Sequence, residues 1–417
     1  MSGLVADTDE HRLIRQSTAT IAARYGQSYF AGRARSGGTV DELWSELGAA
    51  GLLGVHLPAD CGGGGAGLSE LVVILEELAA HGMPMLIAVI SPAICGSIIA
   101  AHGSADLKAR WLPGLADGTR KMAFALTEPD AGSNSHNVST AAIRTGSGWA
   151  ISGGKYYISA IDECEAVLLV ARDAGAARDN SAARDAGAAR DNSAARDAGA
   201  ARDKSAARDA ARPRLSLFVV PTDAPGLTIT PIETALISPD RQFTVFLDGV
   251  AVSEDALIGR AGDGLRQVFA GLNPERILAA ALCNGVGRYA ISRAADYARK
   301  RQVWSEPIGA HQGIAHPLAQ AHVGVELARL ATQRAAELFD CGQDAAEAAN
   351  IAKLAAADAA LAALDQAIQT HGGNGLATEY GLADLWFITR LMRTAPVSRE
   401  MVLNFVARHS LGLPPSY

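Results

Sequence analysis

Glu275 and Arg276 stand side by side in the run NPERIL, where a segment with helical periodicity begins. A carboxylate can remove a proton from carbon when burial raises its pKa. A neighbouring guanidinium can orient that carboxylate or bind a substrate. An acidic residue in the first turn of a helix is also expected from the helix dipole alone. We expect that first turn here because Asn273–Pro274 has the composition of an N-cap followed by a first-position proline.

Other residue types that often carry chemistry do not gather in the sequence. The ten histidines are dispersed, and the five cysteines are odd in number and lack metal-ligand spacing. We therefore expect no metal, no disulfide framework and no structural zinc. No serine lies in a G-x-S-x-G elbow. The run GGGGAG at 62–67 follows no strand signal and precedes no Lys-Ser or Lys-Thr, so it predicts a turn between helices rather than a phosphate cradle.

Composition limits the class of protein. The chain has 417 residues, 49% of them apolar, and a net charge of -7. That length suggests two to three domains. A mildly acidic chain without a dense basic stretch is a poor candidate for binding nucleic acid or an anionic membrane. The first ten residues lack the apolar core of a signal peptide, and the apolar stretch 85–101 is broken by Pro92 and Gly96. These features predict a cytoplasmic protein without a membrane span.

The apolar pattern changes period twice along the chain. Residues 9–116 show helical spacing, for example at 40–47 and 68–80. Short runs rich in Val, Ile, Leu, Tyr and Phe follow and predict an antiparallel β domain; they are 122–126, 149–151, 156–159, 166–170, 215–220, 227–230 and 243–247. From about residue 264 helices return, including 316–341 and 345–370. We predict an α+β fold with an N-terminal helical domain (1–120), a central β domain (121–255) and a C-terminal helical bundle (256–417).

A low-complexity repeat interrupts the β domain. The run RDAGAARDNSAA begins at Arg172, recurs twice with one change to Lys204, and ends in a partial copy at Pro213. Nothing larger than Ala is available to bury, so the copies cannot stack into a core. We expect the insert 172–213 to be a duplicated surface loop that lengthens a hairpin connection.

Three separated segments together resemble the acyl-CoA dehydrogenase family. They are FALTEPDAGSN at 124–134, YARKRQVWSEPIGAHQ at 297–312 and QTHGGNGLATEY at 369–380. Each is moderately specific alone, and their order across an α-β-α layout is strongly specific. The resemblance covers nearly the whole chain except the repeat. It implies the fold of that family and α,β-dehydrogenation of an acyl-CoA thioester with FAD as cofactor.

The resemblance also implies a cofactor site. Main-chain groups of Leu126 and Thr127 would meet the polar edge of the isoalloxazine ring, and Ser133 would contact phosphate or substrate. In the run KYYIS, Tyr157 would cover the flavin face and Ser159 would approach its reactive nitrogen, although a buried strand also accounts for both. The residues implied at the dinucleotide of a neighbouring subunit are Arg301, Gln312, Gln369, Gly372 and Gly373. Arg suits phosphate because its planar fork donates two parallel bonds. Glycines let the dinucleotide approach closely, and they also suit a helix C-cap.

The usual base of the family does not align with an acidic residue here. An ungapped count places that position on Pro396, which has neither a carboxylate nor an N–H. Some members carry the base on the long helix of the C-terminal domain, in a Glu-Arg pair like Glu275–Arg276. Glu275 is therefore the expected base and Arg276 the expected orienting or CoA-binding partner, with Glu400 in reserve. A one-residue shift would let the Val397 N–H hold the thioester oxygen.

Three functions remain open from sequence. The first is an acyl-CoA dehydrogenase that passes electrons to an electron-transfer flavoprotein and forms a homo- or heterotetramer, as the resemblance implies. The second is a non-catalytic partner subunit, which Pro396 favours. The third is a flavin oxidase or monooxygenase on the same scaffold, acting on a substrate without CoA. Fold alone does not choose among them.

Overall fold

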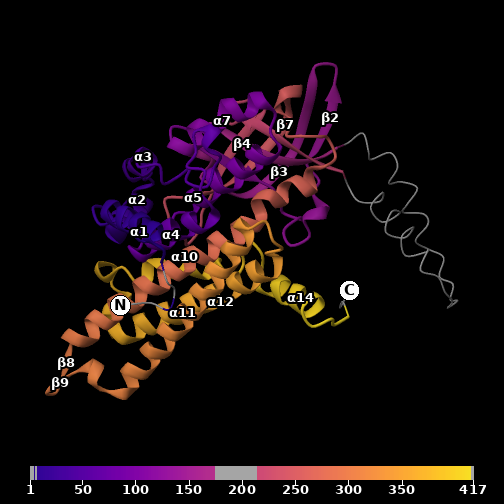
Figure 1. The fold of residues 1–417 in the computed structure, drawn as a ribbon. Helices are drawn as coiled ribbons and strands as arrows, with labels where there is room; N and C mark the ends of the chain where they lie inside the picture. Colours follow the sequence, from indigo (N-terminus) through magenta and orange to yellow (C-terminus); the bar gives the residue numbers. More distant parts are fainter. Residues whose placement is uncertain (1–3, 5–6, 174–213, 415–417) are drawn as a thin grey trace, which may run out of the picture.

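The computed structural model describes residue 4 and residues 7–173 and 214–414. A helical region comes first and packs beside a sheet, and a second set of long helices follows (Figure 1). The first region contains α1 (Asp9–Ala22), α2 (Gly26–Ser36), α3 (Asp41–Ala49), α4 (Leu68–Ala80), α5 (Leu86–Ala88), the π-helical segment η2 (Val89–Gly96), α6 (Ser97–His102) and α7 (Ala105–Asp117). The predicted helix at 68–80 is confirmed at both ends.

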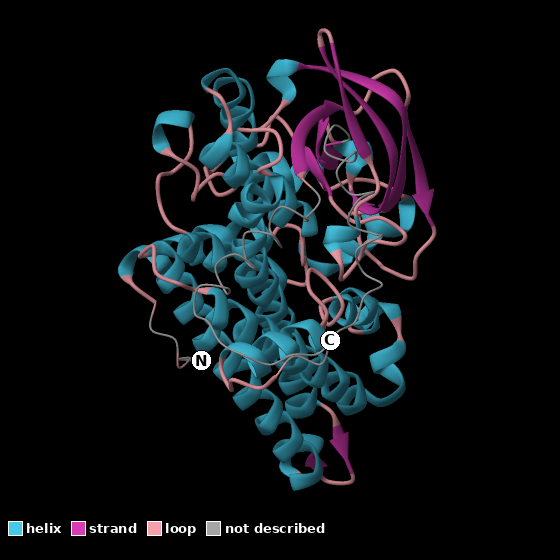
Figure 2. Cartoon of the chain, turned by 90° about the vertical axis from the view of Figure 1, so that its right-hand side faces the viewer, coloured by secondary structure: helices cyan, strands magenta, loops and turns pink. Residues whose placement is uncertain are grey.

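Seven strands make the central sheet, shown in magenta in Figure 2. They are β1 (Met122–Ala125), β2 (Ala141–Thr145), β3 (Gly148–Ser159), β4 (Ala166–Asp173), β5 (Leu215–Pro221), β6 (Leu227–Ile232) and β7 (Gln242–Ser253). The order is β1-β4-β2-β3-β7-β6, and β5 pairs with β4. The expectation of an antiparallel sheet is wrong at two pairs, because β4 runs parallel to both β1 and β2. The chain makes β2 and β3 between β1 and β4, and this length allows β4 to return in the same direction.

The C-terminal helices form a bundle with a small hairpin at one end. They are α10 (Gly264–Lys300), α11 (Gln312–Asp340), α12 (Ala346–His371), α13 (Trp386–Leu391) and α14 (Arg399–His409), and the hairpin strands are β8 (Gln302–Val303) and β9 (Glu306–Pro307). The short helices of the chain are η1 (Ala59–Cys61), η3 (Ser135–Asn137), η4 (Ile161–Glu163), η7 (Glu254–Ala256), η8 (Ile308–Ala310), η9 (Gly372–Leu376), η10 (Thr378–Tyr380) and η11 (Ala383–Leu385). The α+β class and the helix–sheet–helix order are confirmed.

Helix α10 begins at Gly264, ten residues before Pro274, which the sequence predicts as its first helical residue. Asn273 and Pro274 lie inside the helix, so their interpretation as an N-cap and first helical residue is wrong. Packing overrides the local signal. A Cβ on Gly271 would lie 2.8 Å from Cγ2 of Ile94, which shows how closely this part of α10 rests on η2. The proline removes one backbone hydrogen bond, and the buried contacts on both sides of it keep the helix continuous.

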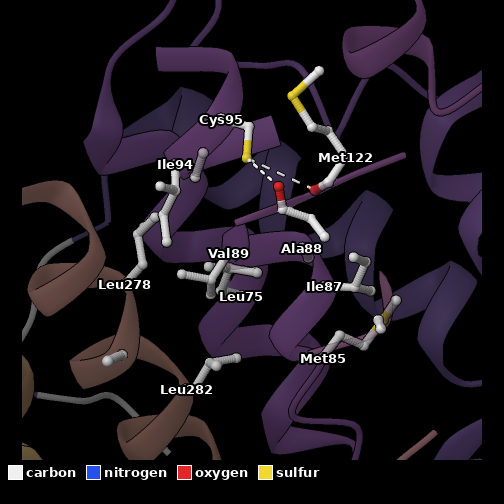
Figure 3. Packing of buried hydrophobic residues seen from close by; sticks show 14 of the residues in the cluster. Leu75, Met85, Ile87, Ala88, Val89, Ile94, Cys95, Met122, Leu278 and Leu282 are labelled. Carbon is white, nitrogen blue, oxygen red and sulfur yellow. Dashed lines mark hydrogen bonds between the residues drawn. The ribbon is translucent and has the colours of Figure 1, made fainter. Parts of the chain in front are cut away.

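The core between the helical regions is densely packed around α10. Leu278 and Leu282 of α10 face Leu75, Val89 and Ile94 of the N-terminal region (Figure 3). Helices α4 and α10 approach so closely that a Cβ on Gly285 would lie 2.3 Å from the carbonyl oxygen of Glu76. The stretch of α10 between Gly271 and Gly285 is therefore positioned by close contact with the N-terminal region.

The repeat joins two paired strands, as expected for a lengthened hairpin. Arg172 of β4 pairs with Leu215 of β5 in an antiparallel register. Residues 174–213 of the repeat lie outside the described residues. In the described ranges, no helix combines the length and the apolar character that crossing a bilayer requires.

Two helical glycines separate the effect of close packing on stability from the effect of helix propensity. Gly285→Ala should destabilise the fold by about 1–3 kcal/mol, because its methyl group meets the backbone of α4. Gly324→Ala on α11 should be neutral or stabilising by up to about 1 kcal/mol, since its Cβ meets only Ala359 at 3.8 Å. Urea unfolding of both variants checks this, and equal stabilities would contradict the α4–α10 contact.

Candidate functional site

Glu275 lies about three turns beyond the start of α10, eleven residues after Gly264. The helix dipole acts on the first turn, so it no longer accounts for an acid at this position. Glu275 is half-buried. Burial raises the pKa of its carboxyl to about 7, and the positive charges of Arg276 and Lys353 oppose that rise. A carboxyl with a pKa near neutrality can exchange a proton with a substrate under ordinary conditions.

Arg276 is held by its own helix turn. One terminal nitrogen donates to the carbonyl oxygen of Leu272 at 3.3 Å and to Oδ1 of Asn273 at 3.0 Å. Its Nε is buried and finds no acceptor among the described residues. The guanidinium therefore keeps donor capacity for a further group beside Glu275.

The Pro396 loop, residues 392–398, joins α13 to α14. The peptide bond between Ala395 and Pro396 is cis. Glu400, the reserve candidate, is exposed in the first turn of α14. The helix dipole accounts for an acid at this position, so Glu400 remains the weaker of the two candidates for a base.

Leu126 and Thr127 follow directly after β1 and are half-buried. Their carbonyl groups are both engaged by β3. Nζ of Lys155 donates to the carbonyl oxygen of Leu126 at 3.1 Å, and the Tyr156 N–H donates to that of Thr127 at 2.9 Å. The segment is thus fixed to the sheet through its carbonyls.

A buried ion pair supports this segment. Lys155 has no exposed surface, and its Nζ lies 2.8 Å from Oε1 of Glu128. The carboxylate also accepts from the backbone N–H groups of Ser139 at 2.6 Å and Thr140 at 3.0 Å. Burial alone would raise the pKa of Glu128, but Lys155 and these donors outweigh it and lower the pKa to about 2. The carboxylate therefore stays charged at any ordinary pH.

The remaining sheet candidates differ in exposure. Tyr157 is 53% exposed and has a φ of 58°, at an irregularity in the β3–β7 register. This left-handed backbone turns a large ring outward from the strand, next to the ring of Tyr156 at 4.3 Å. Ser159 is half-buried and its Oγ lies 3.1 Å from Oε1 of Gln242, whereas Ser133 is exposed. An outward ring in a strained conformation favours the ligand-contact interpretation of Tyr157 over the buried strand.

Glu275 and β1 share a neighbour in Cys95. The buried Sγ of Cys95 lies 3.4 Å from the carbonyl oxygen of Ala123 and 3.8 Å from that of Met122, as the dashed lines in Figure 3 show. Burial raises the pKa of the same thiol well above its ordinary value, and the charge of Glu275 adds to that rise. The structure therefore brings the candidate base and the strand that leads to Leu126 and Thr127 into one region.

The candidates for the dinucleotide lie elsewhere on the chain. Arg301 follows α10 directly, so it is 26 residues from Glu275 along one helix, or about 39 Å. Arg301 and Gln312 are exposed near the β8–β9 hairpin, at the opposite end of the molecule from the sheet (Figures 1 and 2). Within one chain, the structure does not bring these two residues to Leu126 and Thr127.

The Gly-rich segment after α12 lies near the same end of α10. His371 stacks on Tyr297 at 4.2 Å, and Nδ2 of Asn374 donates to the Tyr297 hydroxyl at 3.1 Å. Gln369, Gly372 and Gly373 are exposed. Gly372 follows the last helical residue with a φ of 59°, so the expected helix-ending role of this pair is confirmed at Gly372.

Three charged residues of the site were missed by sequence reasoning. Glu128 and Lys155 lay inside segments that we singled out for other residues, and Lys353 lay in an alanine-rich helical stretch. The signal that the sequence offered for Lys353 was a lone lysine among alanines. Long charged side chains are seldom buried without a partner, so such a lysine indicates a partner nearby if the helix is buried.

Three stretches of the chain match models of known domains. Residues 8–119, 123–188 and 262–411 match the N-terminal, middle and C-terminal domains of acyl-CoA dehydrogenase. The chain is 52% identical over 413 residues to acyl-CoA dehydrogenase FadE12 of Mycobacterium tuberculosis, covering 99% of this chain and 98% of that protein. The chain belongs to the acyl-CoA dehydrogenase family. The resemblance drawn from the three motifs is confirmed.

Solved structures share the fold of this family member over nearly its full length. A glutaryl-coenzyme A dehydrogenase in complex with glutaryl-CoA superposes with a TM-score of 0.86 at 24% identity, covering 99% of this chain and 98% of that one. PigA with FAD and proline superposes with a TM-score of 0.85 at 21% identity, covering 99% and 100%. Because both identities are below 25%, the likeness to these structures establishes the fold alone.

The Glu128–Lys155 pair should make a large contribution to stability. Glu128→Gln leaves a buried ammonium without its counter-charge and should cost about 3–5 kcal/mol of unfolding free energy. Glu254→Gln removes an exposed pair with Arg144 and should cost at most about 1 kcal/mol. The two variants are compared by urea unfolding at neutral pH, and a small effect at Glu128 would contradict the pair's role in holding Leu126.

Proposed function

We propose that this chain is an FAD-dependent enzyme that dehydrogenates an acyl-CoA thioester between its α and β carbons, with Glu275 as the base. The reaction removes a proton from the α carbon and a hydride from the β carbon. FAD would accept the hydride when bound. The chain itself must supply a base, donors for the thioester oxygen, and contacts that hold cofactor and substrate.

The observation that carries the proposal is the environment of Glu275. Glu275 is half-buried and lies beyond the first turn of α10, and burial raises the pKa of its carboxyl to about 7. An α-proton is weakly acidic, so a carboxylate of raised basicity is the more effective acceptor. Arg276 stands beside it with a free Nε. We assign to Arg276 the orientation of the carboxylate or the binding of the CoA portion.

The thioester oxygen gains negative charge as the proton leaves, and it needs hydrogen-bond donors. Pro396 has no N–H to give. The next residue, Val397, is the candidate donor, because its N–H makes no hydrogen bond to another described residue. This assignment keeps the family's use of a backbone donor while moving it by one residue.

Two copies of the chain would form one cofactor site. Leu126, Thr127, Ser133, Tyr157 and Ser159 would meet the flavin end in one copy. The phosphate and adenosine end would meet residues of another copy, namely Arg301, Gln312, Gln369, Gly372 and Gly373. The guanidinium of Arg301 suits this role because the side chain is exposed and its planar fork can donate two parallel bonds to phosphate. A single chain separates the two groups, which supports an oligomer, and we propose the tetramer of the resemblance.

The reduced cofactor must be reoxidised by a partner. We propose an electron-transfer flavoprotein in this role. Pro396 favours a second candidate, a partner subunit that has lost catalysis, because the position lacks the usual carboxylate. A third candidate is a flavin enzyme that acts on a substrate without CoA. The superposition on PigA with FAD and proline leaves this candidate open.

Anaerobic titration with acyl-CoA separates these candidates. Straight, branched and ring-bearing acyl-CoAs should include one that bleaches the flavin of the native protein. Glu275→Gln should lower the bleaching rate at least about 100-fold while flavin stays bound, because the base is gone. Glu400→Gln is the matched control and should keep most of the rate.

The outcomes of that titration are distinct. Flavin that no acyl-CoA bleaches would favour the partner subunit or a substrate without CoA. Fast reoxidation of the reduced flavin by air would favour an oxidase or monooxygenase. Equal bleaching by native protein and Glu275→Gln would remove Glu275 as the base.

The rate of flavin reduction should depend on pH through Glu275. Glu275 must be ionised to accept a proton, and its pKa is raised to about 7. Activity should therefore be full above this pKa and fall about tenfold for each pH unit below it. Stopped-flow reduction measured from pH 5 to pH 9 checks this, and a flat profile through pH 7 would contradict the assignment.

A further inference from the structure

Lys353 is a buried cation that the proposed reaction does not use. It lies on α12 and is 2% exposed. Its Nζ donates to the carbonyl oxygen of Val397, in the Pro396 loop. A buried ammonium costs several kcal/mol unless it is well paired, and an apolar side chain would fill the same space at lower cost. The position therefore needs an explanation beyond packing.

Two ion pairs also join α12 to the Pro396 loop and to the first residue of α14. Asp358, five residues after Lys353 on the same helix, lies 2.6 Å from Nε of Arg393 and 3.4 Å from Nε of Arg399. The loop also closes on itself, because the Arg399 N–H donates to the carbonyl oxygen of Arg393 at 2.9 Å. Lys353 contacts Val397 itself, the residue that carries the free N–H.

Helix α12 packs against α10 along the bundle, and the same ammonium interacts with charged groups on α10. Its charged and titratable neighbours are Glu275, Arg276 and Cys283 of α10 and Asp358 of its own helix. Burial lowers the pKa of Lys353 to about 8, so the group is charged at neutral pH. Burial also raises the pKa of the Cys283 thiol to about 12, so that neighbour is uncharged. Glu275 and Asp358 are thus the negative groups that Lys353 faces.

We propose that Lys353 is a positioning residue that ties the Pro396 loop to α12 and holds a positive charge beside Glu275. The inference rests on the proposed role of Glu275 as the base. One side chain then performs two tasks. It fixes the segment that presents the Val397 N–H, and it favours the ionised form of the carboxylate that must accept the proton. Lys353 touches neither reacting atom in this account.

Lys353→Met and Lys353→Arg test the two tasks together. Methionine keeps the length and loses both charge and donor, whereas arginine keeps both. Lys353→Met should free the loop, so that trypsin cleaves after Arg393 and Arg399 at least about tenfold faster than in the native protein. It should also move the acid limb of flavin reduction upward by about one pH unit, because Glu275 loses a favourable charge. Lys353→Arg should retain most of the native behaviour in both measurements.

Asp358→Asn serves as the control for a loosened loop. It removes the anchor of Arg393 and Arg399 and leaves the ammonium in place, so cleavage should accelerate without an upward shift of the acid limb. Should Lys353→Met fail to fold, Lys353→Gln, which keeps an N–H donor without the charge, must show the upward shift with a smaller gain in cleavage.

The proposed function and the positioning role of Lys353 can be contradicted independently of each other. If no acyl-CoA reduces the flavin of the native protein, the proposed function fails, and cleavage still tests the loop contact. If Lys353→Met is cleaved as slowly as the native protein, or if its acid limb stays at the native pH, the positioning role of Lys353 is overturned.

Discussion

Keeping the Glu275 carboxyl largely out of water is the constraint on which the proposed chemistry depends. Removing a carboxylate from water costs free energy, and the chain offsets that cost with the positive charges of Arg276 and Lys353 rather than with a tight ion pair. A tight pair would hold the pKa low and leave a weak base. Because Glu275 is half-buried without a tight ion pair, the pKa of its carboxyl is raised to about 7, which suits a group that must accept a proton near neutrality.

The rest of the structure places this carboxyl. Close packing of α10 on α4 and η2 fixes the helix that carries it. The Glu128–Lys155 pair fixes the segment after β1, where the flavin ring would lie. The length of α10 then separates Glu275 from Arg301 by about 39 Å, more than one catalytic centre spans. In the oligomer that we propose, a second copy of the chain would complete the cofactor site.

Much of this was predictable from sequence, and the failures have physical causes. Periodicity located α4 and most strands because burial on one face imposes it. The start of α10 was wrong because Asn273–Pro274 is a strong local signal that tertiary packing overrides. The parallel partners of β4 were missed because strand direction depends on where intervening strands pair. Lys155 and Lys353 were missed because a buried lysine is recognised only by the carboxylate or carbonyl groups that surround it.

Exchange of the α-hydrogen of a bound acyl-CoA with deuterium from the solvent tests the central claim most directly. This measurement follows the base itself, separately from transfer of hydride to the flavin. In D2O, the native protein should catalyse incorporation of deuterium at the α carbon, and Glu400→Gln should do the same. Glu275→Gln should fall to the rate without protein. Exchange that persists in Glu275→Gln would contradict the assignment of Glu275 as the base.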